Sequence, residues 1–254
     1  FNFNFDFKEG RSRDMIELIC FVKRKEGMDR DAFHEHWLNH HGPLIRNTPE
    51  LSKYVLRYEQ NHRTERDSER DRGSAGHDGV TIQWFENMQA FIGFCTDSAY
   101  HELIAPDEAK FLDRSAFHMF FAAEPIVQMP VREEHSAGGV KLLCMIPRAK
   151  TRSVESFHEH WTGPHAAIFR DSPELSRHIL GYRQYPRLAA DYERKGDPQF
   201  DGLTEQFFES EDAFWEFAQE PDYRDKVAPD EDTLLIRKGL NFILTRQADV
   251  IIGE

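Results

Sequence analysis

The chain has 254 residues, of which 39% are hydrophobic and 30% are charged. Its 21 phenylalanines are too many for a disordered chain of similar charge, so we expect a folded core. The formal net charge of −13 would repel phosphate groups, and no basic stripe offsets it, which excludes nucleic acid as an expected partner.

Membrane and redox signals are also weak. No apolar run approaches the ~18 residues of a membrane span, and the first residues lack the basic-then-apolar order of a signal peptide. Cys20, Cys95 and Cys144 lie within apolar runs and not at paired loop spacings. We interpret them as buried free thiols, with a Cys20–Cys144 disulfide as the alternative. The sequence therefore predicts a cytoplasmic protein without a membrane partner.

The first predicted elements are strands and one amphipathic helix. Phenylalanine alternates with polar residues at the start of the chain, as it would in a strand, at Phe1, Phe3, Phe5 and Phe7. The apolar run 16–22 predicts the first core strand. Asp29 then suits a helix N-cap, and Trp37 and His41 follow on one helical face. We expect this helix to end before Pro49, because proline disfavours the α conformation in the residue ahead of it.

Four further elements are predicted before residue 125: strand 54–60, strand 80–85, an aromatic-rich helix around 91–94, and strand 117–122. The charged segment 62–76 is interpreted as a solvated loop between the first two of these strands. Asp78-Gly79 predicts a turn that enters strand 80–85.

The second half of the chain repeats the first. Residues 33–37 read FHEHW and return as residues 157–161, and the match continues at a shift of 124 positions. After one residue is lost, the copies match again at a shift of 123, so that Ala105-Pro106-Asp107-Glu108 falls on Ala228-Pro229-Asp230-Glu231. We therefore predict two domains, 15–127 and 140–246, with a polar linker over 130–139.

Each copy reads as strand, helix, strand, strand, helix, strand. This βαββαβ order is typical of the ferredoxin-like fold, in which helices cover one face of an antiparallel sheet. The other face of each sheet must also be buried, and two such sheets in one chain can stack on each other. The predicted fold class is α+β, with two ferredoxin-like repeats fused into a pseudo-dimeric α+β barrel. Pairing within the chain leaves a further homodimer open.

The motifs resemble those of the EthD family, within the dimeric α+β barrel superfamily. The resemblance rests on Phe33, Trp37, the run His41-Gly42-Pro43-Leu44, the run Pro49-Glu50-Leu51 with Tyr54, and Ala105-Pro106-Asp107-Glu108. The second copy departs from this pattern at Ala166-Ala167 and at His178. The resemblance implies a role like those of family members, in aromatic catabolism, in polyketide dehydration or beside oxygenases. Relatives in the superfamily include isomerases, cofactor-free monooxygenases and haem-handling proteins.

Four residues are candidates for catalysis. His41 and His165 lie near the end of the first helix of each copy, where a histidine can move protons near neutral pH, and the resemblance to isomerases supports this position. Tyr54 and His178 are expected to begin the second strand and to assist them. The alternatives are a core histidine bonded to a backbone carbonyl, and an aromatic that only packs on the sheet.

Five residues are candidates for substrate binding: Trp37, Trp161, Gln83, Gln206 and His118. The two tryptophans offer apolar walls, and the two glutamines lie in the middle of apolar strands, where a buried amide must find hydrogen bonds. His118 has Asn241 as its counterpart, so it would distinguish the two copies. Asp107 and Asp230 are interpreted as structural residues of a local turn.

A metal site is weighed and not predicted. His36 and His40 have the i, i+4 spacing of helical ligands, but the second copy has Pro164 in place of His40 and the string is not an HExxH motif. His34, His36, His158 and His160 are therefore expected on solvated helix edges. We also expect no cofactor.

The sequence favours an enzyme for a small-molecule substrate. The leading hypothesis is a cofactor-independent lyase, dehydratase or isomerase that uses acid–base catalysis on a small aromatic, lactone or polyketide-like compound. The alternative is a non-catalytic accessory protein that binds a small molecule or haem.

Overall fold

The computed structural model describes residues 15–70, 76–132, 139–194 and 199–253. The strand predicted at Phe1 to Phe7, and most of the predicted linker 130–139, lie outside these residues. Within the described ranges, no helix has the length and apolar character needed to cross a membrane. Cys20, Cys95 and Cys144 are free thiols.

The first repeat contains the predicted elements in the predicted order. Its strands are β1 (Ile16–Val22), β2 (Val55–His62), β3 (Gly79–Phe85) and β4 (His118–Ala122). Its helices are α1 (Arg30–His36), α2 (Gly42–Arg46), α3 (Pro49–Ser52), α4 (Glu65–Arg70), α5 (Met88–Thr96) and α6 (Ala105–Phe111), with π-helical segments at Trp37–His41 and Tyr100–Ile104 and a 3-10 turn at Arg114–Ala116.

The second repeat has the same order. Its strands are β6 (Val140–Ile146), β7 (Gly181–Pro186), β8 (Gly202–Phe208) and β9 (Asn241–Arg246). Its helices are α7 (Val154–His160), α8 (Ala166–Asp171), α9 (Pro173–Ser176), α10 (Glu211–Gln219) and α11 (Ala228–Leu234), with π-helical segments at Trp161–His165 and Tyr223–Val227 and 3-10 turns at Ala189–Glu193 and Arg237–Gly239.

Two five-stranded sheets result, in the orders β10-β2-β3-β1-β4 and β5-β7-β8-β6-β9. All pairs are antiparallel. Four strands of each sheet come from one repeat, and their order is that of the ferredoxin-like split βαβ unit. The prediction of two fused ferredoxin-like repeats is thus confirmed.

The fifth strand of each sheet is an edge strand that the repeat pattern does not contain. β10 (Asp249–Ile252) pairs with β2, and β5 (Ile126–Met129) pairs with β7. The chain accordingly forms two compact units: the first comprises the described residues within 1–124, 188–196 and 248–254, and the second those within 125–187 and 197–247. Each unit therefore combines most of one repeat with a short segment from elsewhere in the chain.

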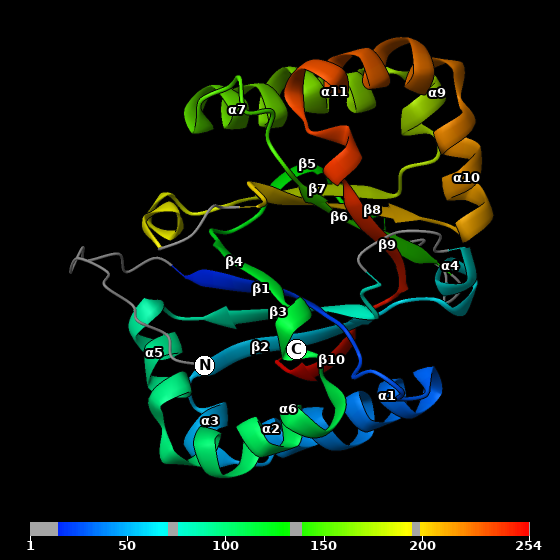
Figure 1. Ribbon diagram of the computed structural model, residues 1–254. Helices are drawn as coiled ribbons and strands as arrows, with labels where there is room; N and C mark the ends of the chain where they lie inside the picture. Colours follow the sequence, from blue (N-terminus) through cyan, green and yellow to red (C-terminus); the bar gives the residue numbers. More distant parts are fainter. Residues whose placement is uncertain (1–14, 71–75, 133–138, 195–198, 254) are drawn as a thin grey trace. The chain divides into compact units, whose positions relative to one another are not determined.

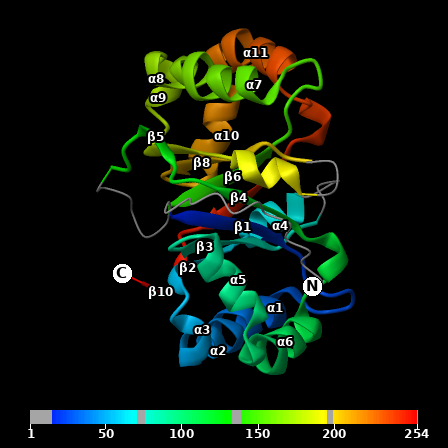
Figure 2. The ribbon, with the colours of Figure 1, turned by 90° about the vertical axis from the view of Figure 1, so that its left-hand side faces the viewer.

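Helices cover one face of each sheet. In the first unit these are α1, α2, α3, α5 and α6 (Figure 1), and in the second α7 to α11 (Figure 2). The core of each unit lies between its sheet and these helices and is rich in aromatic rings, among them Phe85, Phe91, Phe208 and Phe214. The aromatic density of the predicted second helix is therefore core packing.

Of the segment 62–76, predicted from its charge to be a solvated loop, the structure describes residues 62–70 as strand and helix with a buried ion pair. β2 extends through His62, α4 follows, and Arg63 and Asp67 are both buried and form an ion pair of 2.6 Å between Nε and Oδ2. A buried, paired charge is compatible with packing, and net polarity alone could not show this.

The Asp-Gly pairs are not turns. Gly79 and Gly202 begin β3 and β8, and a Cβ on Gly79 would lie 2.5 Å from the Trp37 ring, while one on Gly202 would lie 2.6 Å from the Trp161 ring. The glycine is required because the tryptophan packs against the strand backbone. The aspartate before Gly79 has a different role. Oδ2 of Asp78 accepts a hydrogen bond of 2.8 Å from the backbone N–H of Arg24, which lies just after β1.

Candidate functional site

The first helix of the first repeat places a histidine over the sheet. The Asp29 carboxylate caps the helix as predicted, accepting from the backbone N–H groups of Asp31 and Ala32. The helix widens into a π-helical segment over Trp37–His41 and then continues as α2. Trp37 and His41 are buried at the two ends of this segment, and such π segments frequently occur at functional sites.

A second π segment positions two acidic residues opposite the histidine. Tyr100–Ile104 leads into α6, which has Pro106 in its first turn, where a missing N–H does no harm. Asp107 and Glu108 follow in that turn, and Asp107 is buried.

His41 and Asp107 form a buried hydrogen bond. Nδ1 of His41 lies 3.0 Å from Oδ2 of Asp107. Burial by itself would raise the pKa of Asp107, but the hydrogen bonds and charges of His41 and His36 outweigh it and hold that pKa well below its usual range. A carboxylate on Nδ1 fixes the ring orientation and leaves Nε2 of His41 available to a ligand.

The pKa of Glu108 is shifted in the opposite direction to that of Asp107. The Glu108 oxygens accept from the Tyr100 hydroxyl at 3.2 and 3.3 Å, and Nη2 of Arg114 lies 3.3 Å from Oε2. Burial nevertheless raises the pKa of Glu108 above its usual value, against the opposing charges of His41 and Arg114. Burial and the neighbouring Glu108 also raise the pKa of Tyr100, which therefore remains a hydroxyl donor. Two neighbouring acid groups on α6 thus have pKa values shifted in opposite directions.

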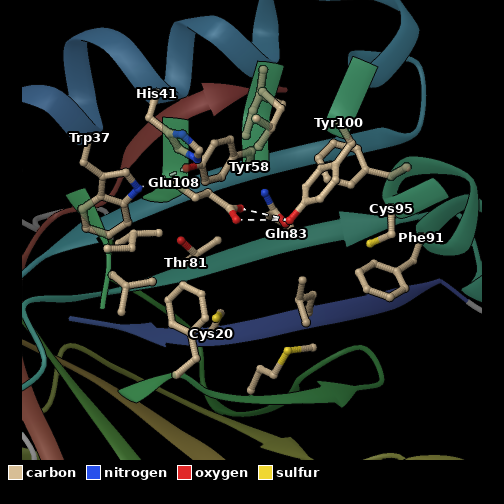
Figure 3. Close-up of a pocket in the computed structure, with 18 residues that line it drawn as sticks. Cys20, Trp37, His41, Tyr58, Thr81, Gln83, Phe91, Cys95, Tyr100 and Glu108 are labelled. Atoms are coloured by element: carbon tan, nitrogen blue, oxygen red, sulfur yellow. Dashed lines mark hydrogen bonds between the residues drawn. The ribbon is translucent and has the colours of Figure 1, made fainter. Parts of the chain in front are cut away.

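These groups surround a cavity of about 90 Å³ between the sheet and the helices (Figure 3). Its polar lining consists of His41, Glu108, Tyr100, Tyr58, Thr81 and Gln83. Burial raises the pKa of Tyr58 to about 12. The remaining walls are apolar or sulfur-containing: Leu18, Cys20, Val22, Trp37, Ile45, Phe91, Phe94, Cys95, Ile104, Leu112, Phe117 and Met119. A small site with few polar groups and mostly apolar walls is typical of small-molecule binding.

The second repeat builds the same arrangement. Nδ1 of His165 lies 2.8 Å from Oδ2 of Asp230, and the Tyr223 hydroxyl donates to Oε1 of Glu231 at 3.3 Å. Burial raises the pKa of Glu231, as it does for Glu108, against the opposing charges of His165 and Arg237. His165, Tyr223 and Glu231 line a cavity of about 120 Å³.

The buried amide of Gln206 also lines this second cavity. Within the described part of the chain, its Nε2 atom has no hydrogen-bond partner. A buried donor without a partner is unfavourable unless a bound molecule accepts from it.

The structure brings five of the predicted site residues to the two cavities. His41, Trp37 and Gln83 line the first, and His165 and Gln206 line the second. Trp161 is fully buried but packs behind the second cavity, stacked on Phe157 at 5.5 Å between ring centroids. His118 does not line the first cavity, and its ring lies 5.1 Å from that of His77.

Tyr54 and His178 do not begin the second strand as predicted. β2 starts at Val55 and β7 at Gly181, because the short helices α3 and α9 end in turns that contain these two residues. Neither lines a cavity: Tyr54 packs against Gly93, and His178 lies 2.7 Å from Oε1 of Glu220. The strand tyrosines that do reach the cavities are Tyr58 and Tyr182.

The four histidines expected on solvated helix edges, His34, His36, His158 and His160, each have a polar contact within the protein. Nε2 of His36 lies 3.1 Å from Asp107, and Nε2 of His160 lies 2.7 Å from Asp230. Asp107 therefore contacts three histidines, since Nε2 of His40 also lies 3.5 Å from its Oδ1, and Asp230 contacts two, so neither is only a turn residue. The sequence signal for them, and for Glu108 and Glu231, was the repeated Ala-Pro-Asp-Glu motif.

Two antiparallel ferredoxin-like sheets, each with a histidine–aspartate pair and a neighbouring glutamate beside a cavity, define the chain as a tandem ferredoxin-like α+β protein. The EthD domain matches residues 25–115 and 150–236, which together are more than half of the chain. The protein belongs to the EthD domain family, with one domain in each repeat.

Solved structures share the fold at low sequence identity. An anthrone oxidase-like protein has a TM-score of 0.63 at 7% identity, with 95% of this chain and 94% of that chain covered. A proposed monooxygenase from Fusobacterium nucleatum has a TM-score of 0.52 at 11% identity, with 94% and 95% covered. Another from Lactobacillus acidophilus has a TM-score of 0.50 at 13% identity, with 93% and 99% covered. No curated protein shows a significant sequence match to this chain.

Proposed function

We propose that the protein is an enzyme that transfers protons on a small, mostly apolar substrate, as a lyase, dehydratase or isomerase that needs no cofactor for this step. The observation that carries the proposal is the pairing, in each cavity, of a histidine held by an ionised aspartate with a glutamate whose pKa is raised. Neighbouring groups with separated proton affinities are the usual requirement for one base and one acid in the same site.

The chemistry follows from these roles. Nε2 of His41 or His165 removes a proton from a carbon next to a carbonyl, and Glu108 or Glu231, in its protonated form, donates to the oxygen where charge develops. If that oxygen is a leaving hydroxyl, water departs and a carbon–carbon double bond forms, which is a dehydration. If the proton returns to a different carbon, the result is an isomerisation.

The cavities limit the substrate to about one ring. Volumes of about 90 and 120 Å³ are comparable with the ~150 Å³ of an apolar cavity that holds benzene. Gln83 and Gln206 would orient the substrate carbonyl, because both line the cavities and Nε2 of Gln206 lacks a partner among the described residues. Haem is far larger than one ring, so these cavities support the haem-binding alternative less well.

Proton exchange into a panel of probes tests the proposal. Single-ring ketones, β-hydroxy ketones and lactones are incubated with the protein in D₂O, and deuterium incorporation next to the carbonyl is followed by NMR. We expect catalysed exchange for part of the panel, and its loss when His41 and His165 are both replaced by glutamine.

The matched control is His118→Gln, because His118 lies outside the cavity and should leave exchange unchanged. Exchange that persists in the double variant, with circular dichroism unaltered, would remove the histidines from the mechanism. A Soret band on titration with haem, together with absence of exchange, would favour the accessory role.

A further inference from the structure

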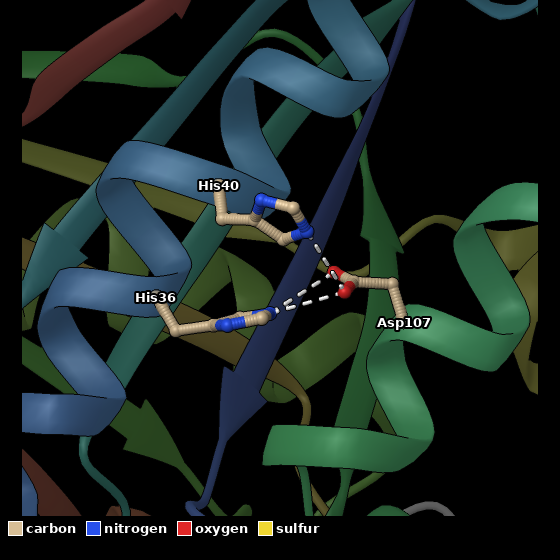
Figure 4. A group of neighbouring side chains, drawn as sticks. All are labelled: His36, His40 and Asp107. Atoms are coloured by element: carbon tan, nitrogen blue, oxygen red, sulfur yellow. Dashed lines mark hydrogen bonds and ion pairs between the residues drawn. The ribbon is translucent and has the colours of Figure 1, made fainter.

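Three potential metal ligands converge between the first helix and α6, outside the lining of the first cavity. They are His36 at the end of α1, His40 in the π-helical segment, and Asp107 in α6, and Figure 4 shows the two rings directed towards the carboxylate. Neither His36 nor His40 lines the cavity. The proton-transfer proposal therefore makes no use of these two histidines.

The donor atoms have spacings suited to one ion. Nε2 of His36 is 3.1 Å and Nε2 of His40 is 3.5 Å from Oδ1 of Asp107, and all three ligand atoms lie within 4.8 Å of one another. An ion bound tetrahedrally at ~2.0–2.1 Å needs donors roughly 3.3 Å apart. Two spacings already satisfy this, and the third can shorten because the His40 side chain is 57% exposed and free to rotate.

The carboxylate is well prepared to act as a ligand. Asp107 is 1% exposed, and Oδ2 is held by Nδ1 of His41, which leaves Oδ1 directed at the other two histidines. Such outer hydrogen bonds normally orient the ligands of metal sites. Nζ of Lys110 lies 3.4 Å from Oδ1, but this side chain is 64% exposed and can move into solvent when a cation binds.

The second repeat provides an internal comparison. His160 and Asp230 correspond to His36 and Asp107 and are in contact at 2.7 Å. Pro164 stands in the position of His40, so this side has two of the three ligands. Within the described residues, the His36, His40 and Asp107 cluster is the one that meets the geometry of a metal site.

We propose that His36, His40 and Asp107 bind one divalent first-row transition-metal ion, and that the second repeat does not. Two imidazoles and one carboxylate suit Zn²⁺, Co²⁺ or Fe²⁺, with water completing the coordination sphere at the exposed side. The site lies beside the cavity, and Asp107 connects the two because it also contacts His41, which lines the cavity.

Titration of the purified full chain with Co²⁺ and Zn²⁺ tests the proposal, because visible absorption of Co²⁺ reports its coordination directly. We expect one ion per chain with the spectrum of a nitrogen- and oxygen-ligated ion. His40→Gln should weaken binding by at least ~100-fold, since loss of a direct ligand exceeds the 10–100-fold effect of outer-shell changes. His160→Gln, the control in the second repeat, should leave affinity and stoichiometry unchanged.

Other results would overturn the proposal. These are absence of a spectrum at millimolar Co²⁺, two ions per chain, or binding that survives His40→Gln but is lost in His160→Gln. Because His40 is exposed, its variant is expected to fold, and circular dichroism checks this. The readout is independent of proton exchange, so failure of the enzymatic proposal would not affect it.

Discussion

The two repeats share their cavity residues and differ in what surrounds them. Histidine, aspartate, glutamate, tyrosine and glutamine recur at matching positions, as His41, Asp107, Glu108, Tyr100 and Gln83 in the first repeat and His165, Asp230, Glu231, Tyr223 and Gln206 in the second. Around this set, His40 is matched by Pro164 and Lys110 by Thr233. The difference teaches that the polar groups at and next to the two cavities recur together, whereas the residues at positions 40 and 110, which lie beside Asp107, differ between the repeats.

A second difference concerns the tryptophans. Nε1 of Trp37 donates to the Tyr58 hydroxyl at 3.2 Å, and Trp37 lines its cavity. Nε1 of Trp161 has no hydrogen-bond partner among the described residues, and this ring does not line the second cavity. The second cavity is the larger of the two, at about 120 against 90 Å³. The two cavities therefore share their main polar groups but differ in volume and in the role of the tryptophan.

The largest effect is expected when the glutamates of the two cavities are replaced, together and one at a time. Glu108→Gln with Glu231→Gln should lower proton exchange by ~100-fold or more, because general acid catalysis typically contributes 10²–10⁴-fold. Each single variant should retain the exchange of the unaltered repeat, measured by NMR on the same probes. Loss of all exchange in one single variant would show that only that repeat is active, and no loss in the double variant would exclude the glutamates.

A smaller effect is expected when each tryptophan is replaced by phenylalanine. Both variants lose similar apolar area, but only Trp37→Phe removes an existing hydrogen bond. We expect Trp37→Phe to lower the free energy of unfolding by ~1 kcal/mol more than Trp161→Phe, measured by urea denaturation. Equal losses would mean that the two rings are equivalent in energy despite their different contacts.

The pH dependence of stability tests the pKa shift of Glu231 in the second repeat, which lacks the complete set of proposed metal ligands. Burial raises the pKa of Glu231 above its ordinary value of 4.5, so the folded state holds this proton more tightly than the unfolded state. Its contribution is most favourable below pH 4.5 and is lost as the pH rises through the folded-state pKa.

Glu231→Gln should remove this loss. The variant should therefore gain stability relative to the unaltered protein between pH 4.5 and 8, measured by urea unfolding at each pH. A difference that is constant with pH, or that has the opposite sign, would show that Glu231 is not stabilised in its protonated form.

The smallest effects are expected at the two residues that lie outside the cavities. Tyr54→Phe and His178→Gln should each leave proton exchange unchanged and alter the free energy of unfolding by at most about 1 kcal/mol. Loss of exchange in either variant would restore the role that the sequence suggested for it, and would require the cavity to open towards the end of α3 or α9.

Local patterns were sufficient to predict most of the fold. The apolar run 16–22 gave β1 with its observed bounds, the capping preference of aspartate gave Asp29 as the helix cap, and the succession of strand and helix patterns gave the ferredoxin-like order of each repeat. β5 and β10 were missed because each has only four residues, and its partner strand lies in the other repeat. A pairing over that distance leaves no local periodic signal.

The cavity was predicted less completely. His41, Trp37 and Gln83 could be found because each stands out within its own helix or strand. Asp107 lies 66 residues from His41, and only packing of α6 against the first helix shows that they meet. Tyr54 was misplaced because the turn after α3 shifts the strand, and Tyr58 takes the position expected for it. Tertiary contacts, not residue types, decided these cases.

The β10 strand makes completion of the first sheet depend on a segment that follows the whole second repeat in the chain. β2 is synthesised early, but its outer edge stays open until Asp249–Ile252 has emerged, after the whole second repeat. In the second sheet, the edge strand β5 precedes its partner β7 in the chain, and β9 is the last strand of that sheet. The later-made sheet can thus be completed first, and an exposed edge on β2 leaves unfinished chains open to aggregation.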